Sequence, residues 1–244
     1  MARDNLPNFN RRDVVSHTRF RNMQTSSKDA LKLAAAQEAL KHVLPNRVLG
    51  VGSGSTVNIF IALLKDIAHS IPGAVAASEG SASALRDIGI AVLDPNLVSD
   101  IAVYIDGADE VDNNLMLIKG GGAALTREKV LASAADLFVC MVDQSKRVEC
   151  LGKFDLPIEV IPMATQLVCR RIISLGGVPS VRGGVITDNG NSIIDVVGLS
   201  FADPVALETL LNQLPGAVCN GVFAQRRADI CITAGVGGIQ VQRA

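Results

Sequence analysis

The sequence predicts an α/β protein with a Rossmann-like parallel-sheet domain and a smaller ferredoxin-like α+β domain. Short apolar strands alternate with helical segments over residues 26–142, which is typical of a parallel sheet covered by helices on both faces. From about Asp155 the expected order changes to β-α-β-β-α-β, the pattern of a ferredoxin-like unit. The length of 244 residues, with 48% hydrophobic side chains, suffices for one large domain or two modest ones.

The first part of the chain is expected to form the parallel sheet and its covering helices. Ser26 or Ser27 can cap the first helix, because a serine hydroxyl accepts a hydrogen bond from the free amides at a helix start. The expected helices are residues 26–43, 55–69, 82–88 and 125–135, and the expected strands are 47–51, 74–78, 90–93, 100–105, 115–118 and 137–142.

The second part is expected to form the smaller domain. Gly176 and Gly177 end its first helix by supplying positive φ, and residues 188–191 are typical of a hairpin turn. The expected elements are strand 157–161, helix 164–175, strands 179–185 and 192–197, helix 204–214 and strand 217–223, after which strands 229–233 and 239–241 return to the first domain. The predicted domains are therefore residues 24–154 plus 229–244, and residues 155–228.

Residues 1–23 differ from the rest, because they hold five Arg against two Asp and show no apolar period. We expect a flexible Arg-rich N-terminal extension, or translation upstream of a start at Met23. An Arg-rich targeting peptide is the alternative, which the two Asp weaken.

Composition excludes several classes of function. The net charge of -1, the single Tyr and the absence of Trp argue against a nucleic-acid partner. No apolar run approaches the ~20 residues of a spanning helix, so no membrane partner is expected. The five Cys and three His form no metal-binding pattern, so we expect no metal and free thiols in a reducing cytoplasm.

A glycine-rich loop, residues 50–56, lies between an expected strand and an expected helix. Backbone amides and a helix N-terminus can bind an anion there. A dinucleotide fingerprint would need a third glycine that is missing, which disfavours a nucleotide-dependent oxidoreductase, and no Lys follows as in a Walker A loop. The hydroxyls of Ser53, Ser55 and Thr56 suit a single phosphate monoester; an ordinary tight turn is the alternative.

Four acidic residues stand in the segment 106–112, directly after an expected strand. The ligand crevice of an open α/β sheet lies outside the carboxyl ends of its strands, where Asp106 and Asp109 would be. For Glu110 and Asp112 we expect solvated positions. A metal–carboxylate site would need more oxygen ligands than this segment supplies.

A second glycine-rich segment, residues 119–129, combines a lysine, three glycines and a glutamate. The glycines let the backbone approach a ligand closely, so Lys119 and nearby amides could converge on one oxygen. Glu128 is either a surface residue paired with a neighbouring Lys or a general base. Lys146 follows strand 137–142 at the same sheet edge. These segments supply three functions: a site for a phosphate, a lysine with backbone amides that stabilise an oxyanion, and a glutamate that removes a proton next to a carbonyl. This combination is typical of aldose–ketose isomerisation through an enediolate.

These motifs resemble the ribose-5-phosphate isomerase type A family from about Ser26 to the C-terminus. The matching segments are residues 50–56, 106–109, 119–129, 151–162 and 187–191. The resemblance implies interconversion of ribose 5-phosphate and ribulose 5-phosphate in the non-oxidative pentose phosphate pathway. It also implies an enzyme without a cofactor that forms a homodimer or homotetramer and binds a small sugar phosphate.

The resemblance also implies residue roles. Glu128 would move a proton between C1 and C2. Asp106 and Lys119 would act on O1 and O2 and assist ring opening, and Asp109 would hold sugar hydroxyls or help open the ring. The amides of Gly121 and Gly122 would stabilise the enediolate. The expected substrate-binding residues are Ser53 (where the family commonly has Thr), Gly54, Ser55, Thr56, Asp106, Gly107, Ala108, Asp109, Lys119, Gly120, Gly121, Gly122, Lys146 and Lys32.

A non-catalytic sugar-phosphate sensor with a similar fold is the alternative class of function. Such a regulator would need a DNA-binding module, and the residues before Ser26 are too few for a helix-turn-helix domain. It would also have no need of Glu128 beside the glycines.

Overall fold

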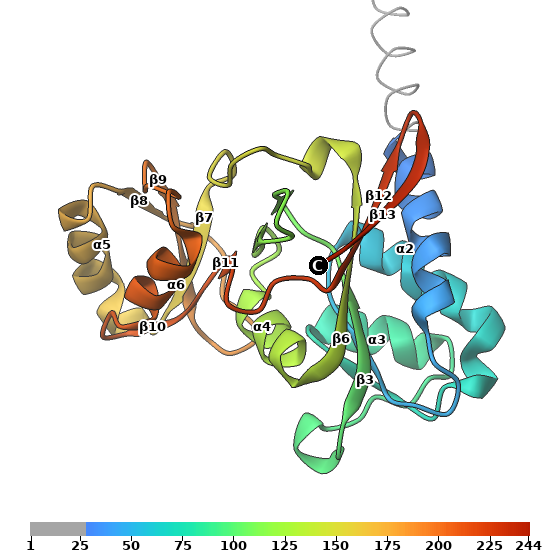
Figure 1. The fold of residues 1–244 in the computed structure, drawn as a ribbon. Helices are drawn as coiled ribbons and strands as arrows, with labels where there is room; N and C mark the ends of the chain where they lie inside the picture. The colour runs from blue at the N-terminus through green and yellow to red at the C-terminus, as the bar shows by residue number, and fades with distance from the viewer. Residues whose placement is uncertain (1–27) are drawn as a thin grey trace, which may run out of the picture.

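The computed structural model describes residues 28–244 and shows two sheets side by side (Figure 1). The predicted N-terminal extension, residues 1–23, lies outside the described residues. The larger sheet has the strand order β13-β12-β6-β3-β1-β2. Its strands are β1 (Leu49–Val51), β2 (Ala74–Ala76), β3 (Ile101–Asp106), β6 (Ala135–Asp143), β12 (Ile230–Gly235) and β13 (Gly238–Arg243).

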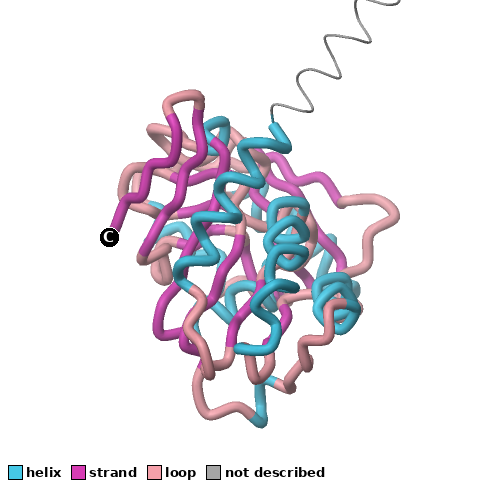
Figure 2. The backbone as a smooth tube through the Cα atoms, turned by 90° about the vertical axis from the view of Figure 1, so that its right-hand side faces the viewer, coloured by secondary structure: helices cyan, strands magenta, loops and turns pink. Residues whose placement is uncertain are grey.

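Helices cover both faces of this sheet, as the continuous burial of β3 requires. A helix over residues 28–39, α2 (Ser55–Leu64) and α3 (Glu79–Asp87) share one apolar core with the sheet, and they lie in front of the strands in Figure 2. The helix α4 (Leu125–Ala134) packs on the opposite face. All strand pairs in this sheet are parallel except β12 with β13, so the predicted Rossmann-like parallel sheet is confirmed.

The smaller sheet is antiparallel and has the order β10-β7-β9-β8. This is the strand order of a ferredoxin-like unit, in which the first and third strands are central. Two helices pack on one face over a separate apolar core. The elements in chain order are β7 (Leu156–Val160), α5 (Thr165–Ser174), β8 (Val178–Val181), β9 (Ser192–Val197), α6 (Pro204–Asn212) and β10 (Ala217–Asn220).

A three-stranded sheet, β11-β5-β4, lies between the two. Its strands are β4 (Glu110–Val111), β5 (Leu117–Ile118) and β11 (Val222–Phe223). The chain passes from the smaller sheet into this one at Gly221, whose amide donates to the carbonyl of Pro157 at 2.8 Å. Its carbonyl accepts from the amide of Lys119 at 2.9 Å. A side chain would not fit at Gly221, because a Cβ would lie 2.3 Å from the Lys119 carbonyl.

Several sequence predictions are wrong in detail. The predicted strand 90–93 does not form, because Val92 makes only an isolated bridge to Ala74. The predicted strand 217–223 is two strands in two sheets, divided at Gly221. The helix predicted at 82–88 starts earlier, since the side chain of Ser78 accepts from the amide of Ser81. The predicted helix 55–69 is α-helical only to Leu64 and continues as a 3₁₀ turn.

Candidate active site

A cavity of about 280 Å³ opens at the carboxyl edge of the large sheet, where β1, β3 and β6 end. The loop after β1, the glycine-rich loop before α4 and the turn after β6 all reach it, which is the expected place for a ligand in a parallel α/β sheet. Its lining residues are Lys28, Lys32, Ser53, Gly54, Ser55, Thr56, Gly107, Ala108, Asp109, Lys119, Gly120, Gly121, Gly122, Glu128, Met141, Val142, Asp143, Ser145 and Lys146.

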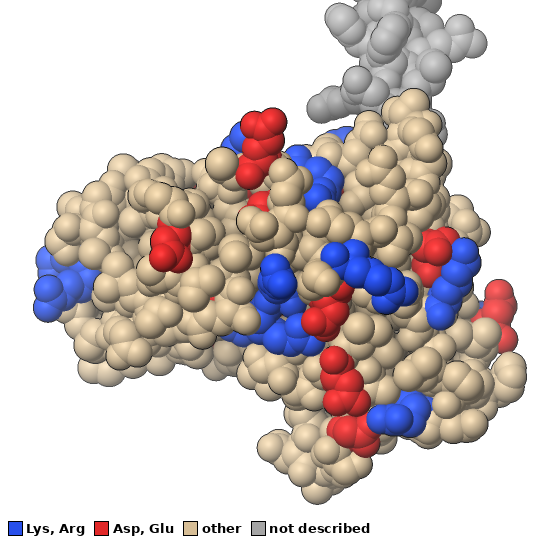
Figure 3. All heavy atoms as spheres, viewed as in Figure 1, with Lys and Arg blue, Asp and Glu red and all other residues tan. Residues whose placement is uncertain are grey.

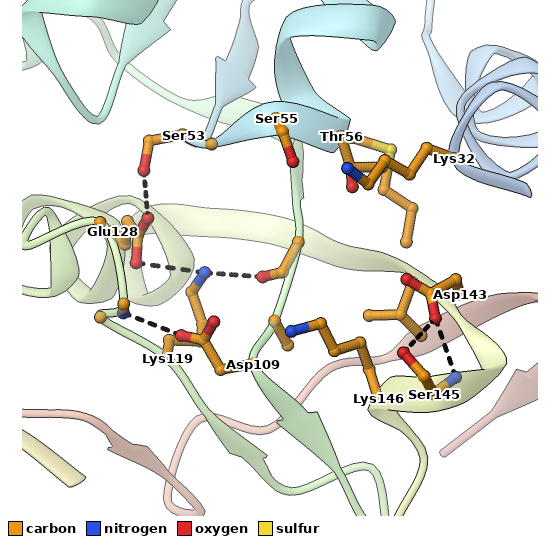
Figure 4. Close-up of a pocket in the computed structure, with 18 of the residues that line it drawn as sticks. Lys32, Ser53, Ser55, Thr56, Asp109, Lys119, Glu128, Asp143, Ser145 and Lys146 are labelled. Carbon is orange, nitrogen blue, oxygen red and sulfur yellow. Dashed lines mark hydrogen bonds and ion pairs between the residues drawn. The ribbon is translucent and has the colours of Figure 1, made fainter. Parts of the chain in front are cut away.

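Glu128 reaches the cavity from the first turn of α4 and is only 4% exposed. Its Oε1 accepts a hydrogen bond from the Ser53 hydroxyl at 2.6 Å, and its Oε2 lies 3.1 Å from Nζ of Lys119 (Figure 4). Burial raises the pKa of Glu128 to about 7, with a further rise from the charge of Asp106, whereas Lys119 and Ser53 oppose the shift. A carboxyl group with such a pKa can both accept and return a proton near neutrality.

Lys119 follows β5 and is 3% exposed. Its ammonium lies 2.7 Å from Oδ2 of Asp106 and donates to the carbonyl of Gly107 at 2.7 Å. Burial disfavours the charged ammonium, but the two carboxylates of Asp106 and Glu128 outweigh burial and raise the pKa of Lys119 above its ordinary value. The lysine is therefore a fixed positive charge beside Glu128.

Asp106, the last residue of β3, is fully buried behind Lys119 and is not among the residues that line the cavity. Its carboxylate accepts from the amides of Ser53 and Gly107 at 3.0 and 2.7 Å and from the hydroxyl of Tyr104. Together with Lys119, these donors occupy both carboxylate oxygens. The carboxylate also requires a glycine at position 52, since a Cβ there would lie 1.9 Å from Cγ of Asp106.

Asp109 lines the cavity on the side of the glycine-rich loop. It accepts a hydrogen bond from the amide of Gly121 at 2.8 Å. That amide was expected to face a substrate oxygen, and in this structure it holds the Asp109 side chain. The loop is also fixed from the smaller sheet, because the guanidinium of Arg182 donates to the carbonyls of Gly120 and Gly121 at 3.2 and 3.1 Å.

Basic side chains and hydroxyls form the other end of the cavity. Figure 4 shows Thr56, Lys32 and Lys146 on the side away from Glu128. The first turn of α2 contributes Ser55 and Thr56 at the helix N-terminus, a position that favours an anion. Lys146 lies in a 3₁₀ turn in which the amide of Ser145 donates to the side chain of Asp143. Elsewhere on the face shown in Figure 3, basic side chains are interspersed with acidic ones.

The structure thus brings together every predicted site residue except Asp106 as lining of one cavity, with Asp106 directly beneath it. Sequence reasoning missed Lys28, which also lines the cavity, and Tyr104. A signal for Tyr104 was present, because residues two apart on a strand point to the same face. Within residues 28–244 no group of three or more metal-ligating side chains comes together, and no helix is suited to crossing a bilayer.

Known proteins resemble this chain over most of its length. A family profile described as "Ribose 5-phosphate isomerase A (phosphoriboisomerase A)" matches residues 73–238. The ribose-5-phosphate isomerase A of Acidithiobacillus ferrooxidans is 50% identical over 216 residues, which cover 88% of this chain and 99% of the relative. The chain belongs to the ribose-5-phosphate isomerase A family. The resemblance inferred from the sequence, and the isomerase class it implied, are confirmed.

Solved structures of the family share the fold. The ribose 5-phosphate isomerase A of Neisseria gonorrhoeae superposes with a TM-score of 0.86 at 44% identity, covering 88% of this chain and 97% of that one. A second D-ribose-5-phosphate isomerase, determined in complex with phospho-erythronic acid, has a TM-score of 0.84 at 38% identity and covers 88% and 99% of the two chains. These family structures confirm the predicted fold class.

Proposed function

We propose that this chain interconverts ribose 5-phosphate and ribulose 5-phosphate, as a step of the non-oxidative pentose phosphate pathway, through an enediolate. The observation that carries the proposal is the buried pair of Glu128 and Lys119 at one end of a cavity whose other end is basic. Family membership supports the same reaction.

The two ends of the cavity suit the two ends of the substrate. A phosphate group would lie at the basic end, held by the N-terminus of α2 with Ser55 and Thr56 and by Lys28, Lys32 and Lys146. The sugar carbonyl would then lie near Lys119. A relative was solved in complex with phospho-erythronic acid, a sugar-acid phosphate that carries a carboxylate and a phosphate group.

Glu128 is the proposed base. It takes the proton from C2 of the open-chain aldose and returns it to C1, while a proton moves from O2 to O1. Its pKa of about 7 suits both directions of transfer. Lys119 is the proposed electrostatic partner, because its ammonium lies 3.1 Å from the carboxylate of Glu128 and would be close to the oxygens on which the enediolate charge develops.

The two aspartates have different proposed roles. Asp109 lines the cavity and is therefore the candidate for holding sugar hydroxyls and assisting ring opening. Asp106 is fully buried, does not line the cavity and lies 2.7 Å from the ammonium of Lys119, so we assign it the positioning of Lys119. Of the two amides expected to stabilise the enediolate, only that of Gly122 remains a candidate, since Gly121 holds Asp109.

The domain division, assembly and location are also proposals. The four-stranded sheet takes all its strands from residues 156–220, which supports a smaller domain at 155–228 and a larger one at 24–154 plus 229–244. A homodimer or homotetramer is supported by exposed apolar side chains such as Met163 and Val236, both at least 90% exposed. A cytoplasmic location follows from the pathway and from the free cysteines.

The reaction is tested by incubating purified protein with ribose 5-phosphate in D2O with EDTA. The expected result is ketose formation with deuterium incorporated from solvent at the exchanged carbon. Turnover that disappears in EDTA and returns with a divalent cation would contradict the metal-free mechanism. Binding of ribose 5-phosphate without any turnover would favour the sensor instead.

A further inference from the structure

Glu159 is a fully buried carboxylate in β7, outside the cavity described above. Among residues 28–244 no Lys, Arg or His lies within ion-pair distance of it; its only partners there are neutral donors. Burial of a charge without a cation is costly, and hydrogen bonds must compensate for it. The hydrogen bonds that compensate for the burial of Glu159 therefore indicate the role of its charge.

The four hydrogen bonds to Glu159 come from two segments. Three reach Oε1 from the turn at residues 187–191: the hydroxyl of Thr187 at 2.8 Å and the side-chain amides of Asn189 and Asn191 at 3.1 and 2.8 Å. The fourth reaches Oε2 from the hydroxyl of Thr126, in the first turn of α4. The carboxylate therefore connects the smaller sheet with the helix that carries Glu128.

The first turn of α4 is fixed in several directions at once. Arg127 donates to the carbonyl of Asp188 and to the side chain of Asn189, both at 2.9 Å, and thus binds the same turn. Lys129 donates to the side chain of Glu208 at 2.6 Å. Successive helix residues point about 100° apart, so contacts at positions 126, 127 and 129, on different sides of the helix, fix its rotation about its axis. Glu128 is the residue whose direction this fixes.

We propose that Glu159 is a positioning residue for the isomerisation, which holds the first turn of α4 against the 187–191 turn and thereby fixes Glu128 relative to Lys119. The inference rests on the proposed role of Glu128 as the base. A charged acceptor makes shorter and stronger hydrogen bonds than a neutral one, which suits a contact that must hold a catalytic group to a fraction of an ångström. The smaller sheet thus takes part in catalysis through α4.

The test is a set of threonine variants in the full chain. Thr126→Val keeps the shape of the side chain and removes its hydrogen bond to Glu159, whereas Thr126→Ser retains the hydroxyl. Thr165→Val is a matched control, because Thr165 is also half-buried at a helix start and its hydroxyl donates to a single acceptor, the carbonyl of Pro162. Glu159→Gln, which keeps the size and removes the charge, is a second variant should Thr126→Val fail to fold.

We expect Thr126→Val to lower kcat by about 10- to 100-fold with KM nearly unchanged, since small misplacements of a catalytic group carry costs of this order. Lys119 holds down the pKa of Glu128, so a looser pair also moves the acidic limb of the kcat profile to higher pH. Glu159→Gln should change both quantities in the same direction, and Thr126→Ser and Thr165→Val should behave like the unmodified protein.

Normal kcat and an unmoved pH profile in folded Thr126→Val and Glu159→Gln, with a loss of thermal stability alone, would overturn the positioning role. Glu128→Gln is measured in parallel. Should that variant keep its turnover, the base assignment itself fails. Should it be inactive while Thr126→Val is fully active, only the inference about Glu159 fails.

Discussion

Nζ of Lys119 lies 3.1 Å from Oε2 of Glu128, and both side chains are more than nine-tenths buried. The carboxylate nevertheless has a raised pKa, because burial and the nearby charge of Asp106 together outweigh the ammonium. The proposed base and its proposed electrostatic partner are thus in contact in the structure.

Replacing Glu128 by Gln removes the proposed base and keeps an acceptor for the hydrogen bond from Ser53. We expect kcat to fall by about 10²–10⁴-fold with little change in KM, the usual size of general base catalysis. In the unmodified protein kcat should fall as the pH decreases through about 7, where Glu128 becomes protonated. Steady-state kinetics over a pH series measures both effects. Near-normal kcat in the variant would show that another group moves the proton.

Compared with the unmodified protein, the Glu128→Gln variant should become more stable as the pH rises. A carboxyl whose pKa is raised in the folded state contributes stability below its ordinary pKa of 4.5, and this contribution is lost as the pH increases through about 7. Gln has no such loss, so the difference in unfolding free energy should grow by about 3 kcal/mol in its favour between acidic and alkaline pH. Urea unfolding at several pH values measures it. A difference that is constant with pH would contradict the raised pKa.

Tyr104→Phe removes the hydroxyl that donates to Asp106 and keeps the ring that packs on Phe138. Loss of one hydrogen bond to a charged group should cost about 1.5–3 kcal/mol of stability. Because Asp106 holds Lys119, we also expect kcat to fall about tenfold with KM unchanged, equivalent to ~1.4 kcal/mol in the barrier. Kinetics and thermal unfolding of the purified variant test the two effects.

Tyr104 also provides a spectroscopic check, since it is the only Tyr of the chain and there is no Trp. Burial, and then the charge of Asp106, raise its pKa well above the ordinary value of 10.0. Tyrosinate absorbance should therefore appear only together with alkaline unfolding, followed by circular dichroism. Titration of the phenol in a protein that remains folded would contradict its burial.

Lys32→Ala and Lys146→Ala should weaken substrate binding without altering chemistry. Each lysine lies at the basic end of the cavity, away from Glu128. We expect KM to rise about three- to tenfold and kcat to stay within about twofold, because a uniform binding contact affects ground state and transition state alike. Lys153→Ala, at an exposed position outside the cavity, is the control. A large fall in kcat with unchanged KM would place the phosphate elsewhere.

The sequence predicted which loops meet, because the carboxyl ends of parallel strands share one edge and the glycine-rich segments directly follow strands. Asp109, Lys119 and Glu128 could be assigned to one cavity on that basis, and the structure brings them there. The burial of Asp106 could not be predicted, since it depends on Tyr104 and Lys119 arriving from the same side.

Contacts between the two sheets were beyond sequence reasoning. Glu159 is the one polar residue of the predicted strand 157–161, and only the folded chain shows that Thr126 and the 187–191 turn enclose its carboxylate. Likewise the segment 217–223 is predicted as one strand, and its division at Gly221 accompanies the close approach of the Lys119 carbonyl, which the sequence does not show.

The crossing at Gly221 has a consequence for dissecting this molecule. The backbone of Lys119 is bonded to a residue that follows the last strand of the smaller sheet, so the ammonium end of the site is assembled from both halves of the chain. Excising residues 155–228 and joining the ends would yield a Rossmann-like protein in which the backbone amide of Lys119 loses its hydrogen bond to the carbonyl of Gly221. Exchange of the four-stranded sheet alone between relatives would separate Gly221 and β11 from the strands that precede them, so the exchanged segment must extend beyond Asn220.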